Sequence, residues 1–196
     1  MRLFSINLAI YIILELSYFF LRIVVDKNRS IDIANEREID IIINDDKIIV
    51  KDGRNFSYNF CTRELTKRDI VSYSDYIKLV HEYCHAIHNE ITKYKLCKPF
   101  SLLMSFLVLS TLVFFASFLS TNKVIAILAF VCILIYILQY LFVIYIEISA
   151  NIILLKYKNI RKDSLVVFFI ILNMIKEFVF RFLWVIVLYS VIKNLL

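Results

Sequence analysis

The two longest uncharged runs of the chain are FSLLMSFLVLSTLVFFASFLSTN (residues 100–122) and VIAILAFVCILIYILQYLFVIYI (residues 124–146), separated only by Lys123. Each run reaches the roughly 20 residues that a helix needs to cross the hydrocarbon core of a bilayer. The whole chain is 61% hydrophobic, against about 45–50% in an ordinary soluble protein. These runs predict an integral membrane protein in which residues 99–155 form a transmembrane hairpin.

A third apolar run occupies residues 3–21, behind Arg2. It is too long for a cleavable signal peptide and lacks a small-x-small cleavage site, so we expect residues 1–25 to form a retained transmembrane anchor. Glu15 lies inside this run, and a carboxylate at mid-membrane costs about 2.5–3.5 kcal/mol on insertion scales. We therefore expect Glu15 to be protonated, or to be paired and to face the other helices.

Residues 156–196 comprise a basic connector, KYKNIRKD, and a last apolar segment over residues 164–192. Lys176, Glu177 and Arg181 interrupt this segment near its middle, where charges are costly. Glu177 and Arg181 are one helical turn apart and could pair. Two interpretations stay open: a span with an inward-facing ion pair, or an interfacial helix followed by a shorter span.

The net charge of +6 is concentrated at the ends of the apolar runs. Between Arg22 and Lys98 acidic and basic residues nearly balance, so the charge indicates membrane topology and lipid contact rather than a nucleic-acid partner. The positive-inside rule places the N-terminus outside and residues 26–98 in the cytoplasm of a multi-pass cell-membrane protein. The expected fold is mainly α, with about four transmembrane helices and a small cytoplasmic α+β module.

The module combines strand and helix patterns. IDIII (residues 39–43) and KIIVK (residues 47–51) flank NDD, which predicts a β-hairpin with an Asn/Asp turn. NFSYNF (residues 55–60) could form a further edge strand. From Ser72 the apolar residues recur at helical spacing, and Asp75 three positions on completes a predicted capping box.

None of the four cysteines, Cys61, Cys84, Cys97 and Cys132, forms a C-x-x-C pair. A cytoplasmic location would keep them reduced. We therefore expect small buried side chains and no disulfide framework.

All three histidines lie in HEYCHAIH (residues 81–88), which contains an H-E-x-x-H motif. His81 and His85 share one helix face, with Cβ atoms roughly 5–6 Å apart, and could bind one metal ion. Glu82 is displaced by about 100° around the helix, where it could act as general base for a zinc-activated water. The alternative is a pair of ordinary polar-face histidines. His88 lies one turn beyond His85, and we expect it at the surface or behind the ligands.

A catalytic zinc ion takes three protein ligands and leaves a fourth position open. No histidine follows His88, which leaves a carboxylate as the third ligand. Glu147 is the first charge met after the hairpin returns the chain to the cytoplasmic face, and a cation partner would explain an acid at that depth. An interfacial Glu147 satisfied by Lys156 or Arg161 is the alternative.

Two segments of the chain, YNFCTRELTKRDIVSYSDYIKLVHEYCHAIH (residues 58–88) and EISAN (residues 147–151), have an apolar hairpin between them. In this order they resemble the YugP-like family of neutral zinc metallopeptidases. HtpX-like membrane proteases share the arrangement. Where the first family has an acidic residue near its E-x-x-A sequence, this chain has Ser149 or Asn151.

The resemblance implies a gluzincin-type site with Glu82 as catalytic base and one Zn²⁺ ion held by His81, His85 and Glu147. The expected function is that of a membrane-embedded zinc-dependent endopeptidase. Its peptide or protein substrate would bind in extended form along an edge strand. Tyr145 and Tyr157 flank Glu147, and either could donate a hydrogen bond to the oxyanion.

Two other classes of function stay open. The chain could be a catalytically degenerate membrane protein, such as an immunity or scaffold component, that retains a metal site, although intact Glu82 argues against it. It could also be a transporter or channel that uses Glu15, Glu177 and Arg181, although no internal repeat supports that class.

Overall fold

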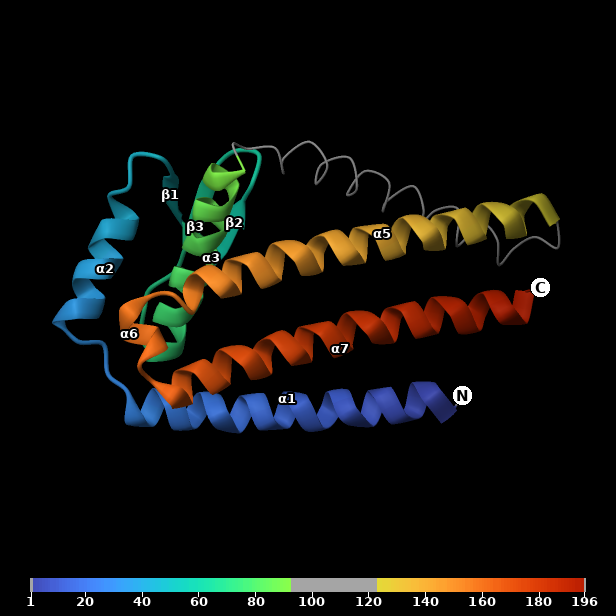
Figure 1. Cartoon of the computed structure of the whole chain (residues 1–196), viewed down its shortest axis with the longest axis horizontal. Coiled ribbons are helices and arrows are strands. Elements are labelled where there is room, and N and C mark those ends of the chain that lie inside the picture. The colour runs from blue at the N-terminus through green and yellow to red at the C-terminus, as the bar shows by residue number, and fades with distance from the viewer. Residues whose placement is uncertain (1, 93–122, 196) are drawn as a thin grey trace. The chain divides into compact units, whose positions relative to one another are not determined.

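The computed structural model describes residues 2–92 and 123–195 (Figure 1). The described chain is mainly helical and contains one three-stranded sheet, which confirms the mainly α prediction. The predicted first span of the hairpin, residues 100–122, lies outside the described residues. In chain order the elements are α1 (Arg2–Asn28), α2 (Ile33–Ile43), β1 (Ile49–Asp52), β2 (Ser57–Asn59), β3 (Glu64–Lys67), α3 (Tyr73–Ile91), α5 (Lys123–Leu154), α6 (Lys158–Arg161) and α7 (Ser164–Leu195).

The chain divides into two compact units. The first comprises Met1–Glu15, Lys98–Tyr145 and Ile175–Leu196, and the second comprises Leu16–Cys97 and Ile146–Met174. The long helices α1, α5 and α7 each contribute residues to both units, so the units do not follow chain order.

Two described helical stretches are long and apolar enough to cross a membrane, Ser5–Asn28 in α1 and Ile137–Leu154 in α5. Large apolar side chains of α1, among them Ile13, Phe19 and Phe20, are exposed. Lipid acyl chains would cover such a surface in a membrane. The two stretches agree with the predicted anchor and with the second half of the predicted hairpin.

Within the first unit, a buried lysine pairs with two glutamates. Lys176 of α7 is 8% exposed, and its Nζ lies 3.2 Å from Oε2 of Glu15 and 3.8 Å from Oε1 of Glu177. Glu15 is therefore paired, as expected of a carboxylate inside an apolar helix. Within the described part of the chain, Glu177 pairs with Lys176 and not with Arg181, the predicted partner. The last segment is one continuous helix over Ser164–Leu195.

The second unit contains the sheet, whose strand order is β1-β3-β2. β3 is central and pairs in parallel with β1, where Val50 lies opposite Leu65, and antiparallel with β2, where Tyr58 lies opposite Leu65. β2 falls within NFSYNF and lies at an edge of the sheet, as predicted. The sequence pattern did not predict β3, because its four residues, ELTK, include a single apolar side chain.

IDIII does not form a strand: it is the C-terminal part of α2, so the predicted hairpin is wrong. The side chain of Asp32 accepts a hydrogen bond from the Asn35 N–H, and the Asn35 side chain accepts one from the Asp32 N–H. This capping box starts a helix that places Ile42 in the core, packs Ile39 against it and leaves Ile41 exposed. A short apolar run does not by itself distinguish a helix from a strand, and here the cap decides.

α3 packs against β2, β3 and α2 (Figure 1). As predicted, Ser72 caps the helix, with its side chain accepting a hydrogen bond from the Asp75 N–H. One face of α3, including Tyr76, Leu79 and Cys84, is completely buried in the core of the second unit. Because this face is fixed, the neighbouring face that carries the H-E-x-x-H residues takes up a defined orientation.

The carboxylate of Asp75 is buried at the start of α3 and does not complete the predicted capping box. It accepts hydrogen bonds from Nη2 of Arg68 at 2.6 Å and from the Val71 N–H at 3.4 Å. Nη2 of Arg22, from α1, lies 3.9 Å away. Burial alone would raise the pKa of Asp75, but the hydrogen bond and charge of Arg68 outweigh burial and lower it.

Replacing Asp75 with asparagine is expected to lower the free energy of unfolding by about 1–3 kcal/mol, because the buried position loses a charged acceptor and its ion pair with Arg68. Urea denaturation of the purified protein measures this change. Asp69 is exposed and precedes the same helix, so Asp69→Asn is the matched control, with an expected effect within about 0.5 kcal/mol. Equal effects of the two substitutions would contradict the role given to the buried carboxylate.

One of the four cysteines is not in the reduced state that the sequence predicts. Cys84 is a buried free thiol in the core, as expected. Cys61, in the turn between β2 and β3, is disulfide-bonded, so the expectation of four reduced cysteines is wrong there. The side chains of Cys97 and Cys132 lie outside the described residues.

Candidate metal centre

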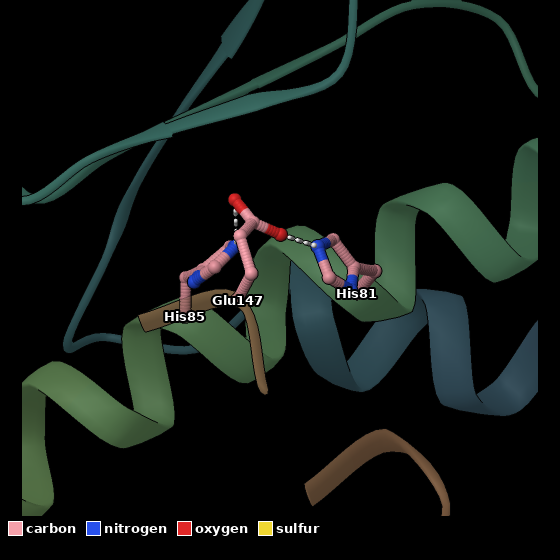
Figure 2. A group of neighbouring side chains, drawn as sticks. All are labelled: His81, His85 and Glu147. Carbon is pink, nitrogen blue, oxygen red and sulfur yellow. Dashed lines mark hydrogen bonds and ion pairs between the residues drawn. The ribbon is translucent and has the colours of Figure 1, made fainter. Parts of the chain in front are cut away.

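Three side chains from α3 and α5 converge in the second unit (Figure 2). Nε2 of His81 lies 3.2 Å from Oε2 of Glu147, and Nε2 of His85 lies 3.7 Å from Oε1 of the same carboxylate. The two imidazole rings are 4.7 Å apart and nearly perpendicular, at 83°. One potential ligand atom from each residue lies within 4.8 Å of the others. The three residues could therefore hold one metal ion.

The local structure explains this convergence. His81 and His85 are one turn apart on α3, and Glu147 lies in the apolar stretch Ile137–Leu154 of α5. The side chain of His85 is 5% exposed and that of His81 is 19% exposed, whereas that of Glu147 is 40% exposed. The group is therefore closed on the His85 side and open beside Glu147. A ligand could approach it from that open side.

Burial and charge affect the two imidazoles in opposite directions. Burial, followed by the neighbouring charge of His81, lowers the pKa of His85 to about 3, so His85 is neutral at physiological pH. Burial also acts to lower the pKa of His81, but the hydrogen bond and charge of Glu147 outweigh it and raise that pKa. A neutral imidazole is the form that binds a metal ion. His85 is thus ready to bind, while a proton competes for His81.

Metal uptake is expected to release a proton from His81 near pH 6.5, the ordinary pKa of an imidazole, because Glu147 raises its pKa above that value. Metal affinity should then rise with pH until His81 is deprotonated and level off at higher pH. Titration calorimetry of Zn²⁺ uptake in buffers of different ionisation enthalpy counts the released protons. An affinity independent of pH from about 6 to 8 would contradict the direction of this pKa shift.

Glu82 lies next to His81 on α3 and is half-buried. Its pKa is raised, chiefly by burial and then by the charge of Glu147, although His81 and a hydrogen bond from the Tyr58 backbone oppose the rise. Tyr58 belongs to β2, so the edge strand lies beside this carboxylate. A carboxylate with a raised pKa suits proton transfer near neutral pH better than an ordinary surface carboxylate does.

In the part of the chain that the structure describes, His88 does not join the candidate metal-binding group, and Lys156 and Arg161 do not pair with Glu147. His88 is buried one turn beyond His85 and is not part of the three-residue group. Lys156 and Arg161 are exposed, and within the described residues neither forms an ion pair with Glu147. The Glu147 carboxylate contacts both imidazoles, as the predicted third ligand requires.

Of the two tyrosines that flank Glu147 in sequence, Tyr157 packs in the core near Cys84 and Tyr83. The oxyanion role of Tyr157 stays a prediction. Tyr145 is 51% exposed and precedes Glu147 by two residues, which places it about 200° around the helix. Its oxyanion role stays a prediction.

The sequence did not indicate several residues that support this group. Asn151, noted above only as a departure from a family pattern, donates a hydrogen bond from Nδ2 to the Glu147 carbonyl at 2.8 Å and also bonds the His81 side chain. Asn89 and Phe60 contact the region from α3 and from the end of β2. An asparagine lies one helical turn after two of the three predicted ligands, His85 and Glu147, and this spacing could have identified both asparagines.

No family model matches this chain, and no curated protein or solved structure matches it either.

Proposed function

We propose that this chain is a membrane-bound zinc-dependent endopeptidase. The observation that supports the proposal is the convergence of His81, His85 and Glu147, with Glu82 beside them. Two imidazoles and one carboxylate form the donor set of many catalytic zinc sites, which keep a fourth position open. The open side next to Glu147 suits such a position. We therefore assign zinc to this group, as one ion.

A bound zinc ion would act as a Lewis acid and lower the pKa of water to about 7. The chain's own groups would do the rest. The Glu82 carboxylate would accept a proton from the attacking water and return it to the nitrogen of the leaving amine. His81 would remain neutral while the ion is bound, and Asn151 would hold its ring in place through the hydrogen bond described above.

The proposed substrate is a peptide or protein chain, membrane-associated, that binds in extended form along β2. β2 is an edge strand, so one row of its backbone groups is not paired within the sheet. A hydrogen bond from the Tyr58 backbone to Glu82 supports this docking site. A peptide added to β2 would thus present its carbonyl groups to the candidate centre.

We also propose a multi-pass cell-membrane protein whose centre faces the cytoplasm, on the basis of the basic residues that flank the apolar runs. The disulfide at Cys61 favours the opposite side, since disulfides persist in oxidising compartments. In intact cells, with the native thiols blocked, an impermeant thiol reagent is expected to label Asn122→Cys and to spare Asn55→Cys. Labelling of the exposed position 55 would invert the topology.

The function is tested by metal analysis of the detergent-purified protein together with a peptide-cleavage assay. We expect one zinc ion per chain, loss of cleavage after treatment with a chelator, and recovery on addition of zinc. Bound metal without cleavage of any peptide would favour the catalytically degenerate membrane protein instead. Cleavage that persists after complete removal of metal would overturn the zinc mechanism.

A further inference from the structure

The imidazole of His85 is held without a hydrogen bond at its second nitrogen. Its Nε2 faces Glu147, while its Nδ1 is buried and has no hydrogen-bond partner among the described residues. In most metal sites the second ring nitrogen donates to a carboxylate, a carbonyl or a water molecule, and that bond fixes the orientation of the ring. The orientation of His85 therefore depends on packing as well as on its contact with Glu147.

Two rings provide this packing. The ring of His81 packs against the ring of His85, with centroids 4.7 Å apart. The ring of Phe60 contacts the His85 ring edge-on, with centroids 5.6 Å apart and an interplanar angle of 71°. Phe60 is buried and also packs against Tyr58, at 5.3 Å. It directly follows β2, so its position depends on how the end of this short strand is fastened to α3.

Asn89 fastens the end of β2 to α3. Asn89 lies on α3 one turn beyond His85 and is completely buried. Its Nδ2 donates to the Phe60 carbonyl at 3.1 Å and to the Tyr58 hydroxyl, also at 3.1 Å. One side-chain amide thus binds the backbone of Phe60 and the side chain of its packing partner, Tyr58, and ties both to the helix that carries His85.

We infer that Asn89 is a positioning residue for the metal centre, acting on His85 through Phe60. It touches neither Glu82 nor the proposed ligand atoms. It holds the one described aromatic ring, apart from His81, that packs against His85. This inference rests on the proposed function, because it requires that the centre binds a metal ion.

The test uses the full-length protein in detergent and measures Zn²⁺ affinity by competition with a chelating dye, together with the absorption spectrum of the Co²⁺ form. Asn89→Ala is expected to weaken Zn²⁺ binding roughly 10- to 100-fold, the effect of losing a residue that supports a ligand, and to change the Co²⁺ spectrum. Phe60→Leu, which keeps the carbonyl that Asn89 binds, should reproduce both changes and remains informative if Asn89→Ala does not fold.

Asn35→Ala is the matched control, because Asn35 is also buried and also makes side-chain hydrogen bonds, but in the cap of α2. It should lower thermal stability and leave Zn²⁺ affinity and the Co²⁺ spectrum unchanged. In the double variant, the losses of Asn89 and Phe60 should not add, since both act by one route.

Parent-like affinity and spectrum in both Asn89→Ala and Phe60→Leu would overturn the inference, as would equal changes in Asn35→Ala. Fully additive losses of Zn²⁺ affinity in the double variant would show that Asn89 does not act through Phe60. A parent protein that takes up neither Zn²⁺ nor Co²⁺ would instead refute the proposed function itself.

Discussion

Replacing Glu82 with glutamine is expected to leave zinc bound and to lower the rate of peptide cleavage by about 10²- to 10⁴-fold. Glutamine has nearly the same size but cannot accept a proton from water, so the substitution removes the proposed base and keeps the ligands. Metal content and initial cleavage rates, measured on the same preparation, separate the two effects. The raised pKa of Glu82 is consistent with this role.

Glu90 offers a matched control for this substitution. It lies on the same helix two turns further on, is half-exposed and pairs with Lys47 at 2.7 Å. Glu90→Gln should therefore retain the parental cleavage rate. If Glu82→Gln cleaves peptides as fast as Glu90→Gln does, Glu82 is not the base and the proposed mechanism fails.

The second large effect is expected at Glu147. Glu147→Ala removes a proposed ligand, so Zn²⁺ affinity should fall by more than the roughly 100-fold seen for residues that only support a ligand. Activity should fall with it. Glu147→Asp, one methylene shorter, should retain some metal but misplace it, with a changed Co²⁺ spectrum.

Ile148 is the control for Glu147. It is the next residue of α5, is exposed and carries no ligand atom, so Ile148→Ala should bind Zn²⁺ as the parent does. Parental Zn²⁺ affinity in Glu147→Ala would exclude this carboxylate from the centre. In that case the contacts with His81 and His85 would be a simple ion pair.

The sequence was informative where one local pattern determines the outcome. The spacing of His81 and His85 and the cap at Ser72 both depend on a single helix, and the structure contains that helix. Glu147 is remote in sequence, but an uncharged run that ends at one acid restricts the choice to that residue. The structure then brings its carboxylate to both imidazoles.

The sequence was less informative where the local structure or the contact depends on residues outside the local pattern. IDIII has an apolar pattern that suits a strand or a helix, and the capping box at Asp32 starts the helix. The ion pairs of Lys176 involve Glu15, more than 150 residues away, a partner that no local spacing indicates. Asn89 lies one turn after His85, but this spacing does not indicate its partners, which belong to another part of the chain.

The distance along the chain between the two halves of the centre has a consequence for biosynthesis. Glu147 follows His81 by 66 residues, which a ribosome adds in about 3–13 s at roughly 5–20 residues per second. During that interval the emerging polypeptide carries two imidazoles and a base but no third ligand. Under the proposed function, the chain would stay inert until the apolar helix that bears its last ligand has been synthesised. The growing chain and its neighbours at the site of membrane insertion would thereby be protected from premature cutting.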